Sequence, residues 1–236
     1  MITRVRQRDQ THYDGRMLVK VEYRNQGICH WKGPIYKFVD VAHADAFASG
    51  SVKIGTLSGY GRLESDRRDP GENSIHRTFT HLNSRDPLQR VFMEAMLDVE
   101  LKGDIELVGH PEGTTIQIFG IDYYCCCFSK SPEAEQFGDK QAVFEISDPH
   151  AWALRLKQQT PLLKRFIVAE VAYGERQARL ETNPAADTDP FLKPIRFITE
   201  REVRVIWVPV LPSKQLPQIP PSPPDQILAA LAKRIR

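Results

Sequence analysis

Hydrophobic and polar positions alternate most clearly near the end of the chain, in FITEREVRVIWVPV (residues 197–210). This stretch begins with charged residues and ends with apolar ones, a pattern that predicts a strand running from a polar edge into a core. Because successive strand side chains point to opposite faces, Glu200, Glu202 and Arg204 are expected to share one face. The alternate positions are apolar and are expected to face the core.

The same pattern reasoning predicts the other elements. Strands are predicted at residues 17–23, 35–40, 52–57, 142–147 and 166–174, with two or three β-rich runs within 104–131. Helices are predicted at 42–50, 86–102, 148–159 and 225–236, with one helical turn at 132–138. The helix at 148–159 has the clearest start, because Asp148 suits the N-cap and Pro149 the first helical position.

Strands outnumber helices and do not alternate with them regularly. This order predicts an α+β domain with a single mixed or mostly antiparallel sheet, rather than a doubly wound parallel sheet. We expect residues 1–212 to form that domain. The segment KQLPQIPPSPP (214–224) is too rich in proline for a helix or a sheet, so residues 213–236 are expected to form an extended tail with a short C-terminal helix.

The composition excludes some classes of protein but indicates no binding partner. The 236 residues are 41% hydrophobic and 26% charged, and the formal net charge of +2 is too small to indicate a nucleic-acid or membrane surface. No apolar run approaches the roughly 18–20 residues that span a bilayer, and MITRVRQRDQ lacks the apolar core of a secretory signal. Cys29 and the triplet 125–127 fit neither a disulfide framework nor a zinc signature. We therefore expect a cytoplasmic protein with reduced thiols.

The glutamates Glu200 and Glu202 are the first candidates for chemistry. In one interpretation they form an edge-strand ion pair with Arg204, which would stabilise the fold little, on the order of 0–1 kcal/mol. In the other, one carboxylate holds a ribose hydroxyl or stabilises a developing cation while the second orients the attacking group. The spacing alone does not choose between these interpretations.

A second candidate is YYCCCFSKS (123–131), which is predicted to be a buried strand that ends at Ser129 and Ser131. Their hydroxyls could bind a carboxylate or a ligand, although serine before lysine and proline is also a common way to end a strand. The contiguous cysteines are expected to fill the core, because no partner histidine lies nearby in sequence.

The irregular loop GYGRLESDRRDPGENS (59–74) is the third candidate. Its carboxylates could ligate magnesium, but they are interleaved with arginines that would compensate their charge. The carboxylates are those of Glu64, Asp66, Asp69 and Glu72. The histidines lack a ligand spacing such as HExxH, and the chain has no GxxxxGK, GxGxxG or GxSxG motif. We therefore predict no metal site and disfavour common nucleotidases, Rossmann dehydrogenases and serine hydrolases.

Taken together, these stretches resemble a bacterial family of domains of unknown function. Its members begin with a tyrosine-basic-aromatic strand and a small helix, as in IYKFVDVAHADAFASGSVKIGTL, and continue into an acidic D-P-x-E loop, as in GRLESDRRDPGE. They then pass a serine-ended strand, as in CCFSKS, and finish in K, F, E-x-E-x-R order, as in FLKPIRFITEREVRVIW. The resemblance spans about residues 35–210.

The same order of parts is similar to the ADP-ribosyltransferase fold. This resemblance implies an NAD-consuming transferase or glycohydrolase in an intracellular toxin, defence or modification setting. It implies that Glu202 holds the nicotinamide ribose while the glycosidic bond breaks, and that Glu200 orients the acceptor. The positions that the resemblance implies for contacting NAD and bracing its site are Lys37, Tyr36, Ser129 and Ser131.

Two features depart from the pattern of that fold. Lys37 stands where the fold usually has arginine or histidine, and Arg204 could neutralise the acidic pair in a purely structural ion pair. A second hypothesis is therefore a non-enzymatic module that binds a protein or nucleic acid through the 59–74 loop and the C-terminal helix. A third is a magnesium-dependent phosphodiesterase built on the loop carboxylates.

Overall fold

The computed structural model describes residues 27–62, 69, 71–72, 74–97, 100–133, 141–179 and 189–236. The edge strand predicted at 17–23 lies outside the described residues, as does most of the helical turn predicted at 132–138. Within the described ranges, no helix is long and apolar enough to cross a membrane.

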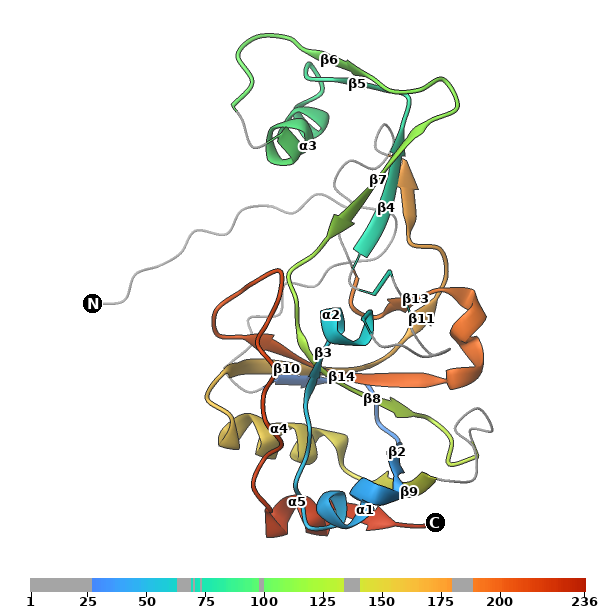
Figure 1. The fold of residues 1–236 in the computed structure, drawn as a ribbon, viewed down its shortest axis with the longest axis vertical. Helices are drawn as coiled ribbons and strands as arrows, with labels where there is room; N and C mark the ends of the chain where they lie inside the picture. The colour runs from blue at the N-terminus through green and yellow to red at the C-terminus, as the bar shows by residue number, and fades with distance from the viewer. Residues whose placement is uncertain are drawn as a thin grey trace, which may run out of the picture.

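The body of the protein is an eight-stranded sheet with strand order β1-β10-β14-β8-β2-β9-β15, in which β3 also pairs with β8 (Figure 1). Its strands are β1 (Gly27–Cys29), β2 (Ile35–Asp40), β3 (Gly55–Thr56), β8 (Tyr124–Ser129), β9 (Gln141–Ile146), β10 (Leu163–Glu170), β14 (Glu202–Pro209) and β15 (Ala232–Arg234). Every pairing in it is antiparallel except that of β1 with β10. The predicted α+β class with a mostly antiparallel sheet is confirmed.

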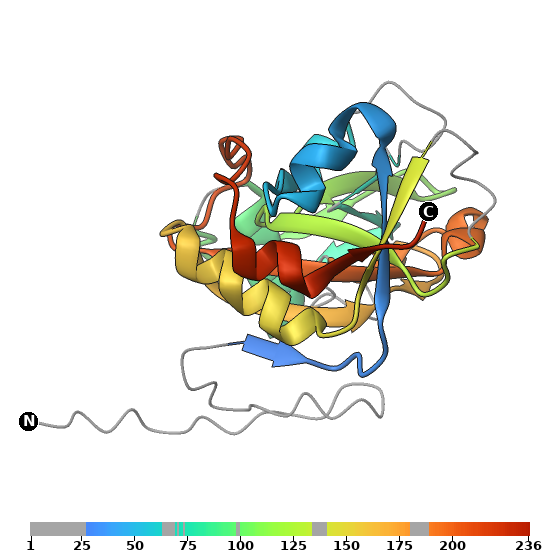
Figure 2. The ribbon, with the colours of Figure 1, turned by 90° about the horizontal axis from the view of Figure 1, so that it is seen from below.

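Helices cover one face of this sheet. They are α1 (Val41–Ala48), α4 (Pro149–Gln159) and α5 (Gln226–Leu231), and they lie side by side beneath it (Figures 1 and 2). The main core lies between them and the sheet, where Trp152 and Leu156 of α4 pack with Trp207 of β14. As predicted, the apolar positions of the 197–210 stretch belong to this core, and Val203, Val205 and Trp207 are fully buried.

Helix α4 follows its sequence signals closely. The Asp148 side chain accepts a hydrogen bond from the Ala151 N–H at the helix start, and Pro149 occupies the first turn. Trp152 and Leu156 are four residues apart and therefore share the face that is buried against the sheet. The Trp207 indole N–H donates to the Ala153 carbonyl at 3.2 Å, which links the helix to the central strand.

On the other face stand α2 (Leu57–Tyr60) and an arm that rises from the body (Figure 1). The base of the arm is a three-stranded sheet of β12 (Gln177–Arg179), β4 (Ser74–Phe79) and β7 (Thr114–Phe119). Its far end carries the pair β5 (His81–Asn83) and β6 (Glu106–Val108) with helix α3 (Pro87–Leu97). The arm has a small core of its own, formed by Phe79, Leu82, Met93 and Leu101.

Three element predictions need correction. The strand predicted at 52–57 is reduced to β3, because helix α2 begins at Leu57. The strand predicted at 197–210 begins only at Glu202. Its first residues form the 3-10 helix η2 (Ile195–Glu200), and Arg201 then takes a left-handed conformation with φ of 45° that turns the chain into β14. The helix predicted at 225–236 stops at Leu231, because the following residues pair with β9 as β15.

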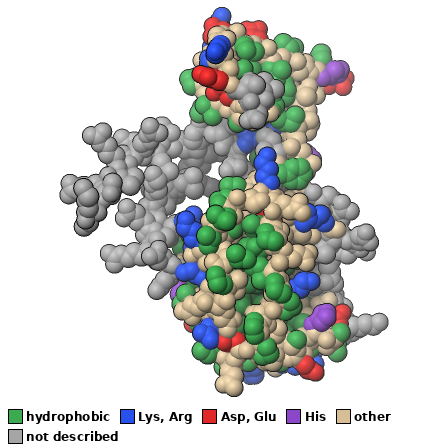
Figure 3. Space-filling view, turned by 60° about the vertical axis from the view of Figure 1, so that its left-hand side comes forward, with side chains coloured by type: hydrophobic (Ala, Val, Ile, Leu, Met, Phe, Trp, Pro, Cys, Tyr) green, Lys and Arg blue, Asp and Glu red, His purple; other side chains and the backbone are tan. Residues whose placement is uncertain are grey.

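The proline-rich segment forms neither helix nor strand, as predicted, but it lies against the body. Leu216 is buried in the main core, and Ser222 hydrogen bonds with Val52. Figure 3 shows hydrophobic side chains gathered in a band down one face of the body, with lysine and arginine side chains along its edges. The remaining strand pair, β11 (Ala172–Tyr173) with β13 (Leu192–Lys193), lies beside the start of β14.

Candidate functional site

Three of the predicted site residues lie in one row across three neighbouring strands. Tyr36 of β2 is in register with Ser129 of β8, and Ser129 is in register with Glu202 of β14. Residues directly opposite one another in antiparallel strands project from the same face of the sheet. The row therefore faces α2 and the base of the arm, on the side opposite the main core.

Glu202 is the charged member of the row and is buried. It is 2% exposed, and its two carboxylate oxygens accept hydrogen bonds from Arg204 Nε at 2.6 Å and from Lys193 Nζ at 2.8 Å. Its backbone N–H donates to the Tyr173 hydroxyl. Burial by itself raises the pKa of the Glu202 carboxyl, but the charges and hydrogen bonds of Arg204 and Lys193 outweigh it and hold this pKa well below its usual range.

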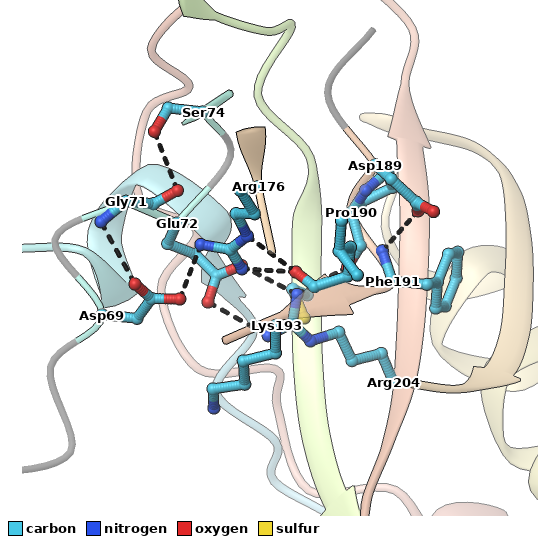
Figure 4. A network of polar contacts seen from close by, with 12 residues as sticks. Asp69, Gly71, Glu72, Ser74, Arg176, Asp189, Pro190, Phe191, Lys193 and Arg204 are labelled. Carbon is cyan, nitrogen blue, oxygen red and sulfur yellow. Dashed lines mark hydrogen bonds and ion pairs between the residues drawn. The ribbon is translucent and has the colours of Figure 1, made fainter. Parts of the chain in front are cut away.

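Arg204 connects Glu202 to the 69–72 segment. Its guanidinium donates to both oxygens of Glu72, at 2.8 and 3.0 Å, in the paired geometry that arginine forms with carboxylates. Arg176 continues the chain of contacts, because it donates to Glu72 at 3.2 Å and to Asp69 at 2.6 Å. Figure 4 shows Arg176 and Arg204 reaching the Glu72 side chain from two directions.

Glu200 enters the same network from η2. Its carboxylate accepts a hydrogen bond from Lys193 Nζ at 2.5 Å, so one lysine holds both predicted glutamates. Burial raises the pKa of the Glu200 carboxyl, and the neighbouring Glu202 charge adds to the rise, although Lys193 opposes it. The two carboxylates converge as predicted, but they do so through the end of a helix and the start of a strand.

The two glutamates differ in the number of cations that hold them. The network, as far as the structure describes it, contains the carboxylates of Asp69, Glu72, Glu200 and Glu202 and the buried cations Arg176, Lys193 and Arg204. Exposed Arg196 lies 3.9 Å from Asp69 at its margin. Within the described network Glu202 pairs with Lys193 and Arg204, whereas Glu200 pairs with Lys193. The burial that raises the pKa of Glu200 is therefore offset less fully than that of Glu202.

The other predicted residues serve local structure. Lys37 follows Tyr36 on the strand and points to the opposite face, where its ammonium donates to the Cys127 carbonyl at 2.8 Å and lies 5.3 Å from the centre of the Phe128 ring. The Ser129 hydroxyl accepts a hydrogen bond from the Ser131 N–H at 3.2 Å. That contact is typical of a serine turn at a strand end.

The Ser131 hydroxyl makes a similar contact, with the N–H of Glu133. Lys37 and Ser131 are therefore outside the row formed by Tyr36, Ser129 and Glu202. Two consecutive strand residues cannot both point to one face, which is why Lys37 and Tyr36 separate.

Lys37 instead lines a cavity where the sheet divides. Strand β2 pairs with β8 at Tyr36 and then leaves it, while β3 pairs with β8 at Cys125 and Tyr124. We call this division the fork. The cavity at the fork has a volume of about 820 Å³. Its walls are β2 from Lys37 to Asp40, one side of α1, residues 51–56, Gly59 and Tyr60 around α2, and residues 218–221.

The lining of the fork cavity combines charged and apolar groups. The inner end lies next to β8, where Lys37 binds the Cys127 carbonyl and Gly55 pairs with Cys125. Phe47, Val52 and Ile219 give the cavity apolar walls. Because a strand rises about 3.3 Å per residue, Lys37 and Asp40 of the same wall are separated by roughly 10 Å along β2.

The remaining sequence candidates carry structural partners. All the cysteines are free, and burial raises the pKa of the Cys126 thiol to about 12, which keeps it protonated. Of the loop carboxylates, Asp69 and Glu72 are held by the arginines of the network, whereas Glu64 and Asp66 lie outside the described residues. The part of the chain that the structure describes contains no cluster of three or more histidine, cysteine or acidic residues suited to a metal ion.

Sequence reasoning missed Lys193 and Arg176. Lys193 lies nine residues before Glu202, a spacing that corresponds to no strand or helix period, and Arg176 reaches Glu72 from 104 residues away. The only available signal was that Lys193 belongs to the quoted stretch FLKPIRFITEREVRVIW.

Compared with known proteins, the chain matches no family model, no curated protein and no solved structure.

Proposed function

We propose that the chain binds an anionic small molecule of the nucleotide class in the fork cavity, and that NAD is such a ligand. The observation that carries this proposal is the cavity itself, with the Lys37 ammonium at its inner end. Its volume of about 820 Å³ lies within the range of small-molecule sites. Mostly apolar walls with a few placed polar groups are also typical of such sites.

Charge supports an anionic ligand. The side chains that line the cavity include the bases Lys37, Lys53 and His43 but the single acid Asp40. An ammonium group can bind a phosphate as a point charge without the paired geometry of arginine. Lys37 could therefore exchange its hydrogen bond with the Cys127 carbonyl for a stronger one to a phosphate oxygen.

Calorimetry and thermal unfolding with NAD test this proposal. A ligand that binds only the folded state raises the unfolding temperature, so NAD should stabilise the wild-type protein by an amount that grows with the logarithm of its concentration above Kd. Lys37→Met should weaken binding at least tenfold, and Lys37→Arg should retain most of it. Lys32→Met removes an exposed lysine outside the cavity and is the matched control. Equal NAD binding by Lys37→Met and Lys32→Met, or no binding by the wild type, would reject the proposal.

A second candidate function is NAD-consuming ADP-ribosyl transfer or glycohydrolysis. Its support is the register of Tyr36, Ser129 and Glu202 on adjacent strands, which are three of the six positions implied by the resemblance to ADP-ribosyltransferases. Cleavage of the nicotinamide bond develops oxocarbenium-like charge, which a fixed carboxylate stabilises. Glu202 could act in this way only after releasing Lys193 or Arg204, because both of its oxygens are occupied.

Nicotinamide release measures that activity directly. Glu202→Gln should abolish release, and Glu200→Gln should reduce transfer to an acceptor more than it reduces hydrolysis. Glu106→Gln, which changes a carboxylate of the arm far from the network, is the control. Equal release by the wild type and Glu202→Gln, or no release by either, would leave the chain as a binding protein.

A further inference from the structure

The proline-rich segment forms one wall of the fork cavity. We call residues 216–222 the strap. Its middle residues, Gln218, Ile219, Pro220 and Pro221, all line the cavity. A segment that only trailed from the body would not present consecutive residues to one cavity.

The first anchor of the strap is Leu216. Its side chain is buried in the main core, and its N–H donates to the carboxylate of Asp122 at 3.1 Å. Asp122 is itself fully buried and also accepts a hydrogen bond from the Ser58 hydroxyl at 2.6 Å. One carboxylate therefore ties the strap to helix α2, which borders the inner part of the cavity.

The second anchor is Ser222. Its N–H donates to the Val52 carbonyl and its hydroxyl accepts from the Val52 N–H, both at 2.9 Å. The Ser51 hydroxyl donates to the Ser222 carbonyl at 2.6 Å. Gly50 lets the chain just after the strap come close, because it has a φ of +83° and a Cβ there would lie 2.1 Å from the Asp225 carbonyl oxygen. The strap is thus fixed against the chain that leads into β3.

Between the anchors, the strap has little conformational freedom of its own. Pro217, Pro220 and Pro221 fix their backbone φ angles near −65°. Ile219 is half-buried and packs against the edge of the main core. The strap therefore presents a pre-formed apolar wall to the cavity that Lys37 also lines.

We propose that the strap is the specificity-determining wall of the cavity, and that Ile219 with Pro220 receives the planar ring of a ligand whose phosphate lies at Lys37. The ligand class is therefore a ring-bearing phosphate ester, such as a mononucleotide or dinucleotide, rather than a compact inorganic anion. The proposal rests on the proposed binding function. Lys37 supplies a charged group and the strap an apolar surface to the same cavity, which suits a ligand with an anionic group and an apolar ring.

Calorimetric titrations of the full chain with NAD, adenosine monophosphate and inorganic pyrophosphate test the strap. The wild type should bind the two nucleotides more tightly than pyrophosphate. Ile219→Ala should weaken nucleotide binding tenfold or more, because even one lost methylene in an apolar pocket typically costs at least that factor. Pyrophosphate binding should stay the same. Leu211→Ala is the matched control, because Leu211 is 79% exposed and does not line the cavity.

The outcomes separate the two proposals. If NAD binding needs Lys37 but is unchanged in Ile219→Ala, the strap proposal is overturned while the binding function stands. If the nucleotides bind the wild type no more tightly than pyrophosphate does, the strap proposal is also overturned. If no ligand binds the wild type, both fail. Ile219→Val, which removes one methyl group, should weaken nucleotide binding in the same direction and replaces Ile219→Ala if that variant does not fold.

Discussion

Arg204→Met is the sharpest test of the buried network. Arg204 is 1% exposed and donates to Glu202 at 2.6 Å and to Glu72 at 2.8 and 3.0 Å. Methionine fills a similar volume but supplies no donor. Each carboxylate would then keep a single cation, Lys193 at 2.8 Å for Glu202 and Arg176 at 3.2 Å for Glu72.

Removing one partner from a buried ion pair typically costs about 3–5 kcal/mol, because the other charge stays buried without compensation. A domain has about 5–15 kcal/mol of stability in total, so Arg204→Met should remove a large part of it. Urea unfolding at pH 7, followed by circular dichroism, measures the change. The neutralising double variant Arg204→Met with Glu72→Gln should recover part of the loss.

The matched control is Arg85→Met, in the exposed pair of Arg85 with Asp104, which should cost no more than about 1 kcal/mol. If Arg204→Met lowers the free energy of unfolding no more than Arg85→Met does, the buried network stabilises the protein no more than an exposed ion pair. If the double variant is no more stable than Arg204→Met alone, the destabilisation does not come from an uncompensated Glu72 charge.

Three further predictions concern single positions. Gly50→Ala should lower the unfolding temperature, because a Cβ would meet the Asp225 carbonyl and alanine disfavours a φ of +83°; an unchanged melting curve would contradict the close packing of Gly50 against the start of α5. The depressed pKa of Glu202 means that its charged form favours the folded state, so this contribution is present above the ordinary glutamate pKa of about 4.3 and is lost as pH falls below it. Urea unfolding between pH 5 and pH 2 should therefore show a smaller loss of stability for Glu202→Gln than for the wild type, and parallel curves would argue against the shift. Asp122→Ala should free the first anchor, so the Leu216 amide should exchange its hydrogen faster while the amides of α4 do not; unchanged exchange at Leu216 would show that the anchor is not needed.

Local signals in the sequence predicted the elements that local contacts form. Helix α4 begins at the predicted cap because Asp148 and Pro149 act within one turn of each other. Strand β2 has the predicted bounds because it ends at Asp40, whose side chain caps the next helix. The predicted apolar face of the 197–210 stretch is confirmed at Val203, Val205 and Trp207, because every second side chain of a strand points to the same face.

Long-range contacts account for what could not be predicted. The 225–236 stretch has an apolar face typical of a helix, but the free edge of β9 pairs with its last residues and overrides that preference. Glu72 accepts hydrogen bonds from both terminal nitrogens of Arg204, although it lies 132 residues away in the chain. The sequence therefore suggested the pairing of Arg204 with Glu202 but could not show that Arg204 also binds Glu72. The fork likewise arises only when β2 and β3 share one edge of β8.

The central position of β14 has a consequence for how the chain folds during synthesis. Strand β14 pairs with β10 on one side and with β8 on the other, so among the described strands it joins the β1–β10 pair to β8, β3, β2, β9 and β15. In chain order it also follows every other strand of that sheet except β15. Until it emerges, the two half-sheets have unpaired edges that could associate with other chains. Non-local pairing of this kind is intrinsically slow, and a nascent chain that stops before Glu202 would expose both edges of the unfinished sheet.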